Sequence, residues 1–251
     1  MNTLTKCALQ WFAGHEAKGD RGTSAAQGFG SIVHALAAEA VRSGVEPDVA
    51  ELSSHIDAVW DALGLAPWIS LRERKEAVGA LETFVQWHRA NPREVLAVEH
   101  DFDVTVNVDG RETQFTGSMD RVELDSEGIH VVDFKTSKTP MSIKDAATNA
   151  QLGVYQLAVE AGGTDGLSAG AGPAGAELVY LRTTNKSAPI RKQPGAPEGT
   201  TSAFEQVREA VRLIGAEEFA ATVGDACGYC AFKRICPAHD DGSSILIEEK
   251  Q

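Results

Sequence analysis

Four cysteines near opposite ends of the chain are the feature that most restricts its fold. Cys227, Cys230 and Cys236 form the pattern C-x2-C-x5-C-P, and Cys7 is the fourth cysteine of the 251-residue chain. Two cysteines separated by two residues can bind one metal centre, and Cys7 would complete a site with four thiolates. Zinc and iron–sulfur centres both accept four thiolates, so the spacing leaves both open. A shared site would bring the two ends of the chain together.

The composition limits the class of protein. No apolar run is long enough to cross a membrane, and the N-terminus lacks the order of a secretory signal, so we expect a cytoplasmic protein. Thiols stay reduced there, which favours metal ligands or free core cysteines over disulfides. The net charge is −13, from 23 basic and 36 acidic residues, so a diffuse basic surface for nucleic acid is excluded. Any DNA contact is expected to be local or supplied by a partner. The acid excess is explained equally by solubility or by acidic metal ligands.

Residues 1–92 are predicted to be mainly helical. Segment 29–42 is an Ala-rich helix, a second helix opens at Pro47-Asp48, and a third covers about 70–88. The apolar residues expected to be buried on the second and third helices are Val49, Leu52, Ile56, Val59, Trp60, Leu63, Leu71, Val78, Leu81, Phe84 and Val85.

The hydrophobic period then changes from helical to alternating. Strands over 102–108, 112–124 and 129–135, joined by turns at 109–110 and 126–128, predict an antiparallel meander. A helix over 145–160, a Gly-rich stretch, a strand over 177–182, a loop over 185–200 and a helix over 202–219 follow. This order predicts an α/β fold with a mixed sheet flanked by helices.

Two carboxylates and a lysine are predicted to meet on neighbouring strands. Asp120 lies in GSMDRVE on the second strand, and Asp133 and Lys135 lie in VVDFKT at the end of the third. Carboxylates this close repel each other unless a cation lies between them, and oxygen ligands suit Mg²⁺ or Mn²⁺. Asp133 and Lys135 share one strand face, so the acid can bind the metal while the lysine orients a water or stabilises a phosphate. Phosphodiester hydrolysis is therefore favoured, while an exposed ion pair is the alternative for D-x-K alone.

Further residues are candidates for the same site. Gln151 and Tyr155 stand four apart on one helix face, where they could contact a phosphate or hold metal ligands; a half-buried tyrosine beside a solvated glutamine is the alternative. His34 lies among small residues that permit close approach, although a lone helical histidine is more often a structural residue than a ligand. The histidines expected to be structural only are His15, His55 and His88.

Four ordered segments together resemble a known family. FGSIVHALAAEA, TGSMDRVEL, VVDFKT and QLGVYQLAV resemble, in order and approximate spacing, the RecB-like nucleases of the PD-(D/E)xK superfamily. This resemblance implies a restriction-endonuclease-like sheet and a metal-dependent DNA nuclease. It also assigns roles to His34, Asp120 and Asp133 as ligands of the divalent metal, to Lys135 as the catalytic lysine, and to Gln151 and Tyr155 as the Q-x-x-x-Y pair. Glu99, in VEHDFDV, fits an acid often found on the first strand, and we expect it to support catalysis rather than perform it.

The cysteine pattern resembles that of a narrower group. A lone cysteine before the helical region and a C-terminal C-x2-C-x5-C are similar to the iron staple of AddB-type nuclease domains and of CRISPR-associated RecB-like exonucleases. The resemblance implies a 4Fe-4S cluster with a structural role, held by Cys7, Cys227, Cys230 and Cys236. Cys7 follows Met1 closely and the chain is acidic, two departures that point to a module of a larger helicase–nuclease of the AdnAB or AddAB type.

The resulting hypothesis is one nuclease domain over 1–251. It comprises a helical region (1–92), a catalytic core (93–220) and a cysteine-cluster segment (221–251). We expect exonuclease-type hydrolysis of single-stranded DNA with Mg²⁺ or Mn²⁺, in double-strand-break repair and recombination, with a helicase motor and a partner subunit delivering the strand. The alternatives are a zinc-stapled nuclease and a non-catalytic DNA-binding or assembly scaffold with a zinc or iron–sulfur site.

Overall fold

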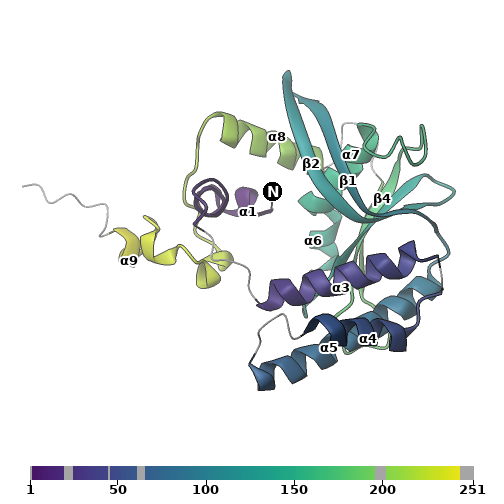
Figure 1. The fold of residues 1–251 in the computed structure, drawn as a ribbon. Helices are drawn as coiled ribbons and strands as arrows, with labels where there is room; N and C mark the ends of the chain where they lie inside the picture. Colours follow the sequence, from purple (N-terminus) through teal and green to yellow (C-terminus); the bar gives the residue numbers. More distant parts are fainter. Residues whose placement is uncertain (1, 20–24, 45, 61–65, 196–201, 244–251) are drawn as a thin grey trace, which may run out of the picture.

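One mixed sheet organises the chain. The computed structural model describes residues 2–19, 25–44, 46–60, 66–195 and 202–243. Within these ranges the sheet has the order β1-β2-β3-β4-β5, with strands β1 (Glu94–Val108), β2 (Arg111–Leu124), β3 (Ile129–Lys135), β4 (Pro173–Tyr180) and β5 (Ile190–Pro194). The first three form the predicted antiparallel meander, β4 is parallel to β3, and β5 is antiparallel to β4. The predicted α/β fold with a mixed sheet and flanking helices is confirmed (Figure 1).

Helices cover both faces of the sheet because residues of β3 and β4 alternate between them. Val132 and Phe134 of β3 pack in one core with α3 (Ala25–Arg42), α4 (Val49–Trp60) and α5 (Pro67–Ala90). Val131 of β3 packs in a second core with α7 (Ala150–Glu160). Figure 1 shows α3, α4 and α5 grouped on the side of the sheet away from α7. No helix among the described residues is long and apolar enough to span a membrane.

The predicted burial of α5 is correct for its second half and wrong at its start. Leu81, Phe84 and Val85 are buried, whereas Leu71 is 72% exposed. The buried residues of α5 begin only at Ala77, so Leu71 precedes the part of the helix that enters the core. On α4, the predicted core residues Leu52, Ile56 and Trp60 are buried. The side chain of Val59 and the whole of Leu63 lie outside the described part of the chain.

The predicted helix over 145–160 is two helices. α6 (Ile143–Ala147) ends before Asn149, and α7 starts immediately after it. The Leu152 N–H donates to Asn149 Oδ1 at 3.1 Å, so this side chain caps the new helix. Ser142 caps α6 in the same way through the Asp145 N–H. The break sets the direction of α7, which carries Gln151 and Tyr155.

The predicted loop over 185–200 contains a strand. Residues Ile190–Pro194 form β5, which pairs with β4 from Gly175 to Val179. The prolines of this segment suggested a loop, but β5 is the edge of the sheet, and Pro194 is its last residue. A proline is tolerated at such a position because it removes no hydrogen bond from a central ladder.

The two ends of the described chain lie side by side. The N-terminal helices α1 (Asn2–Lys6) and α2 (Ala8–Trp11), with the π-helical turn η1 (Phe12–Glu16), lie beside α8 (Ser202–Gly215) and the segment after it (Figure 1). Leu4 and Ala8 pack on Ala210. Phe12 stacks on Phe219, with 4.7 Å between ring centroids. These contacts bring Cys7 to the C-terminal cysteines.

A buried ionic network joins the end of α5 to the sheet. The side chains of Arg121 and Glu123 are 1% and 0% exposed, and Arg121 Nε donates to Glu123 Oε1 at 2.5 Å. Arg93 NH1 lies 2.9 Å from Glu123 and 3.3 Å from Glu177. Burial raises the pKa of Glu177, but hydrogen bonds from His130 and Arg93 outweigh it and lower that pKa to about 2.

We expect this network to make the protein sensitive to acid. Because the folded pKa of Glu177 lies below its ordinary value of 4.5, its contribution is complete above pH 4.5 and is lost as the pH falls towards 2. Glu177→Gln should lower the free energy of unfolding by about 3 kcal/mol at neutral pH and flatten the acid side of the stability profile. Urea unfolding at a series of pH values measures both effects. Superimposable profiles of variant and wild type would contradict this role.

Candidate active site

Asp133 and Lys135 lie on one face of β3, as the alternation of the strand predicts. Lys135 Nζ is 2.7 Å from Asp133 Oδ2, and the Asp133 side chain is 4% exposed. Gln151 of α7 bridges the pair: its Nε2 donates to Asp133 Oδ1 at 2.7 Å, and its Oε1 accepts from Lys135 Nζ at 2.9 Å. Tyr155 OH donates to Asp133 Oδ1 at 3.0 Å. Helix α7 thus fixes the orientation of both charged groups.

Burial shifts the pKa values of Asp133 and Tyr155. Burial raises the pKa of Asp133, the charge of Asp120 raises it further, and Lys135 and Tyr155 only partly offset these effects. Burial also raises the pKa of Tyr155 far above its ordinary value, as do the charges of Asp133 and Asp120. Tyr155 therefore remains a hydrogen-bond donor at any physiological pH.

Asp120 lies where β2 separates from β3. The ladder between these strands ends at the pair Arg121–Val132. Past this last pair, the Phe134 N–H of β3 donates to the side chain of Asp120, at 2.7 Å from Oδ2, instead of to the backbone of β2. The side chain of Asp120 is consequently held at the opening between the strands, next to the end of β3.

His34 and Glu99 complete a second group around Asp120. His34 Nδ1, from α3, is 3.3 Å from Asp120 Oδ2. Glu99 lies on β1 between the pairs Val98–Arg121 and His100–Met119, which puts it opposite Asp120. His34, Glu99 and Asp120 offer ligand atoms that all lie within 4.8 Å of one another. One imidazole and two carboxylates at this spacing fit a divalent cation.

Glu99 adopts a strained backbone conformation at this place. Its φ is 47°, in the left-handed region that a residue with a side chain rarely occupies, at a cost of about 1–3 kcal/mol. Burial raises the pKa of its carboxyl, and the charge of Asp120 raises it further. For His34, burial lowers the pKa, but the hydrogen bond and charge of Asp120, with the charges of Asp133 and Glu99, raise it overall. The group carries an excess of negative charge that a bound cation would relieve.

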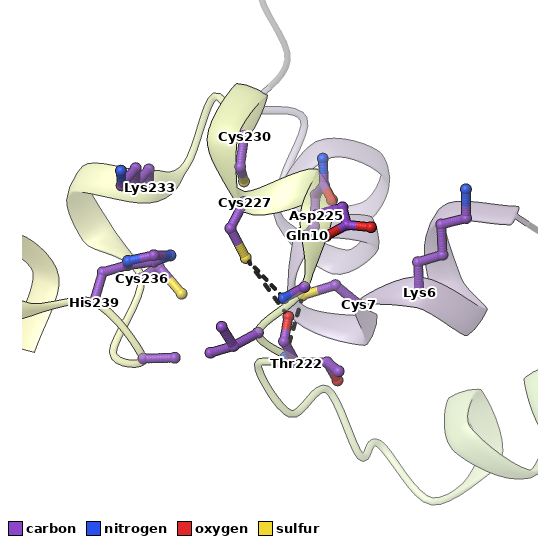
Figure 2. Close-up of a pocket in the computed structure, with 13 residues that line it drawn as sticks. Lys6, Cys7, Gln10, Thr222, Asp225, Cys227, Cys230, Lys233, Cys236 and His239 are labelled. Atoms are coloured by element: carbon purple, nitrogen blue, oxygen red, sulfur yellow. Dashed lines mark hydrogen bonds between the residues drawn. The ribbon is translucent and has the colours of Figure 1, made fainter.

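The four cysteines line a separate pocket of about 480 Å³ (Figure 2). Cys7 precedes α2, and the others lie on or beside the short helices η3 (Asp225–Tyr229) and η4 (Lys233–Ile235). None forms a disulfide. The Gly224 N–H donates to Cys227 Sγ at 3.3 Å, and the Thr222 N–H donates to Cys7 Sγ at 3.5 Å. These amide donors would stabilise thiolates.

The cysteine sulfurs are spread around the pocket. In the described ranges, no three of them lie within 4.8 Å of one another. A single zinc ion with bonds of about 2.3 Å to four sulfurs would require tetrahedral sulfur separations of about 3.8 Å. Lys6 and Lys233 also line the pocket and would offset part of the charge of four thiolates. Four free thiols around one pocket form a donor set that suits a metal centre.

The chain matches the sequence model of the PD-(D/E)XK nuclease superfamily over residues 1–237. It belongs to this superfamily. Membership in the PD-(D/E)XK superfamily implies a metal-dependent nuclease. No curated protein matches the chain. Among solved structures, it is similar to a crystal structure of SSO0001, with 17% identity over 83% of this chain and 96% of that chain and a TM-score of 0.41.

The residues predicted for a PD-(D/E)XK site form two adjoining groups. His34 and Asp120 lie together as expected, and the third member of their group is Glu99. Asp133 belongs to the other group, where it pairs with Lys135. The sequence suggested only a supporting role for Glu99, because its place opposite Asp120 depends on the β1–β2 register. The histidines predicted to be structural lie outside both groups: His15 stacks on Trp11, His88 contacts Arg121, and His55 is exposed on α4.

Proposed function

We propose that this chain is a divalent-metal-dependent deoxyribonuclease that degrades single-stranded DNA from an end. The observation that carries the proposal is that the His34–Glu99–Asp120 group adjoins the Asp133–Lys135 pair at the opening between β2 and β3. The alternative of a non-catalytic scaffold is not favoured, because the acids and the lysine are all present and assembled. The whole chain, 1–251, would form one nuclease domain.

The side chains that would bind the cation and orient the water are already in place. A bound divalent cation would stabilise negative charge on the phosphate and lower the pKa of a water molecule. His34, Asp120 and Asp133 would hold the cation together with Glu99, with Asp133 Oδ2 also paired with Lys135 Nζ at 2.7 Å. Lys135 would orient the attacking water or offset charge in the transition state. Gln151 and Tyr155 would keep the Asp133–Lys135 pair in place.

A larger assembly would deliver the strand. The net charge of −13 disfavours long-range capture of DNA by the chain alone. We therefore propose that it acts as the nuclease module of a cytoplasmic helicase–nuclease of the AdnAB or AddAB type, with a motor and a partner subunit, in double-strand-break repair and recombination.

We also propose that Cys7, Cys227, Cys230 and Cys236 hold a 4Fe-4S cluster with a structural role. The shared pocket and the amide donors to two of the sulfurs support this assignment. Such a cluster would clamp the N-terminal helices onto the C-terminal segment.

The test is a substrate panel with protein purified anaerobically, after iron and zinc have been quantified. With Mg²⁺ or Mn²⁺, linear single-stranded DNA should be degraded, whereas circular single-stranded DNA and RNA should remain intact. Cleavage of the circle would contradict attack from an end, and equal cleavage of RNA would contradict specificity for DNA. Stoichiometric zinc in a colourless protein would contradict the iron–sulfur assignment.

A further inference from the structure

A pocket with several charged residues in its wall lies near the active site, on the α5 side of the sheet. It has a volume of about 590 Å³ and is lined by α5 and by the segments that follow β3 and β4. Both segments continue from strand ends at the site: β3 ends at Lys135, and its pairing partner Tyr180 ends β4. Lys138 and Arg182, a few residues further along, line the pocket. A DNA strand that leaves the active site past the ends of β3 and β4 would meet the pocket.

The pocket carries an excess of positive charge in an otherwise acidic chain. Its basic residues are Arg72, Lys75, Lys138 and Arg182. Two carboxylates face them. Glu76 is 3.0 Å from Lys138 Nζ and also contacts Arg182. Glu73 is 2.6 Å from Arg182 NH2 and 3.0 Å from Arg72 NH2. Lys75 is exposed, and no ion pair involving it occurs among the described residues. Four cations against two carboxylates leave the pocket able to attract an anion.

An exposed aromatic side chain extends this surface along α5. Trp68 is 71% exposed, and the spacing of positions 68, 72, 75 and 79 puts Trp68, Arg72, Lys75 and Gly79 on one helical face. The surface around Gly79 is open, because a Cβ added there would meet no atom within 4 Å. Packing therefore does not require a glycine at this place, although glycine costs a helix about 1 kcal/mol relative to alanine.

We propose that this face binds single-stranded DNA outside the scissile position, with Trp68 stacked on a base and Arg72, Lys75 and Lys138 at phosphates. An aromatic platform beside a row of cations matches what single strands require: a π-face for bases and positive charge for the backbone. A protein partner could also cover an exposed tryptophan, but the cations of the adjoining pocket favour a polyanion. The inference rests on the proposed nuclease function and adds to it a binding surface for the substrate.

Tryptophan fluorescence and DNA affinity test the proposal without cleavage. Trp60 and Trp87 are 3% and 8% exposed, and Trp11 is half-buried and stacked on Phe219, so a stacked base should quench chiefly Trp68. With divalent metal removed, an oligothymidylate of about 16 nucleotides should quench the emission of the full chain. Trp68→Ala should abolish most of this quenching and weaken binding roughly 5- to 100-fold. Lys75→Ala should weaken binding and reduce its salt dependence, whereas Lys144→Ala, which removes an exposed lysine on α6, should do neither.

Separate results would contradict the proposed nuclease function and the proposed DNA-binding surface. Cleavage of a strand of about 4 nucleotides depends mainly on the active site, so Trp68→Ala should slow it less than it slows cleavage of the longer strand. If wild type cleaves neither length, the nuclease proposal fails, while quenching and affinity still test the surface. Wild-type affinity and quenching in Trp68→Ala would overturn the inference and leave a protein partner as the occupant of this face.

Discussion

Asp133→Asn is expected to reduce cleavage of single-stranded DNA by at least about a thousandfold, roughly 4 kcal/mol of transition-state stabilisation. The change removes one negative charge from the proposed metal site and the ion pair that positions Lys135. Folding should survive. Since burial and the charge of Asp120 raise the pKa of Asp133, ionisation of this group at neutral pH costs stability in the folded state. The neutral isostere should therefore unfold at the same temperature as wild type or higher.

A matched control separates this effect from a general change of charge. Asp103, on the same sheet, accepts hydrogen bonds from Gln114 on the exposed β1–β2 hairpin and lies outside the site. Asp103→Asn should leave the cleavage rate unchanged. Single-turnover cleavage rates and thermal unfolding of the three proteins provide the comparison. Metal-dependent cleavage by Asp133→Asn near the wild-type rate would contradict the assignment of this carboxylate.

Cys7→Ser is expected to produce the largest loss of stability. If the four thiolates hold one cluster, Cys7 closes a loop that contains most of the chain, from residue 7 to residue 227. Cross-links over loops of this size stabilise by up to about 5 kcal/mol through chain entropy, which corresponds to roughly 10 °C or more in Tm for a domain of this length. The direct contacts that remain, such as Leu4 on Ala210, form only a small core.

The expected readouts are specific to the ends of the chain. Cys7→Ser should lose iron and visible absorbance, and limited proteolysis should attack the α1–α2 segment before the sheet. Ser43→Ala, a change on the surface of α3 that leaves all four thiols in place, serves as the control. Unchanged iron content and Tm in Cys7→Ser would show that Cys7 is not a ligand and that packing alone joins the termini.

The local features of the site followed from the sequence because they depend on short-range periodicity. The two-residue repeat of a strand puts Asp133 and Lys135 on one face, and the spacing of a helix does the same for Gln151 and Tyr155. The Asn149 cap was also visible in the sequence, since asparagine is a common N-cap, but the helical pattern on both sides of it hid the break between α6 and α7.

Features that depend on long-range strand pairing could not be predicted from local periodicity. Glu99 reaches the His34–Asp120 group because β1 starts at residue 94, pairs in one register with β2 and adopts a left-handed conformation at Glu99. Periodicity encodes none of these. Likewise, β5 forms because it pairs with the free edge of β4. Leu71 is exposed because the buried residues of α5 begin only at Ala77. In each case a tertiary neighbour decides what the local pattern leaves open.

The measurement that tests the central claim most directly is the dependence of single-stranded DNA cleavage on Mn²⁺ concentration, compared between wild type and Glu99→Gln. Our account predicts no cleavage after chelation and a saturable dependence for wild type. Glu99→Gln should shift this dependence to Mn²⁺ concentrations at least about tenfold higher, because the proposed site loses a carboxylate ligand. Cleavage that persists without a divalent cation, or identical Mn²⁺ dependence in the two proteins, would contradict a catalytic metal held by Glu99 together with His34, Asp120 and Asp133.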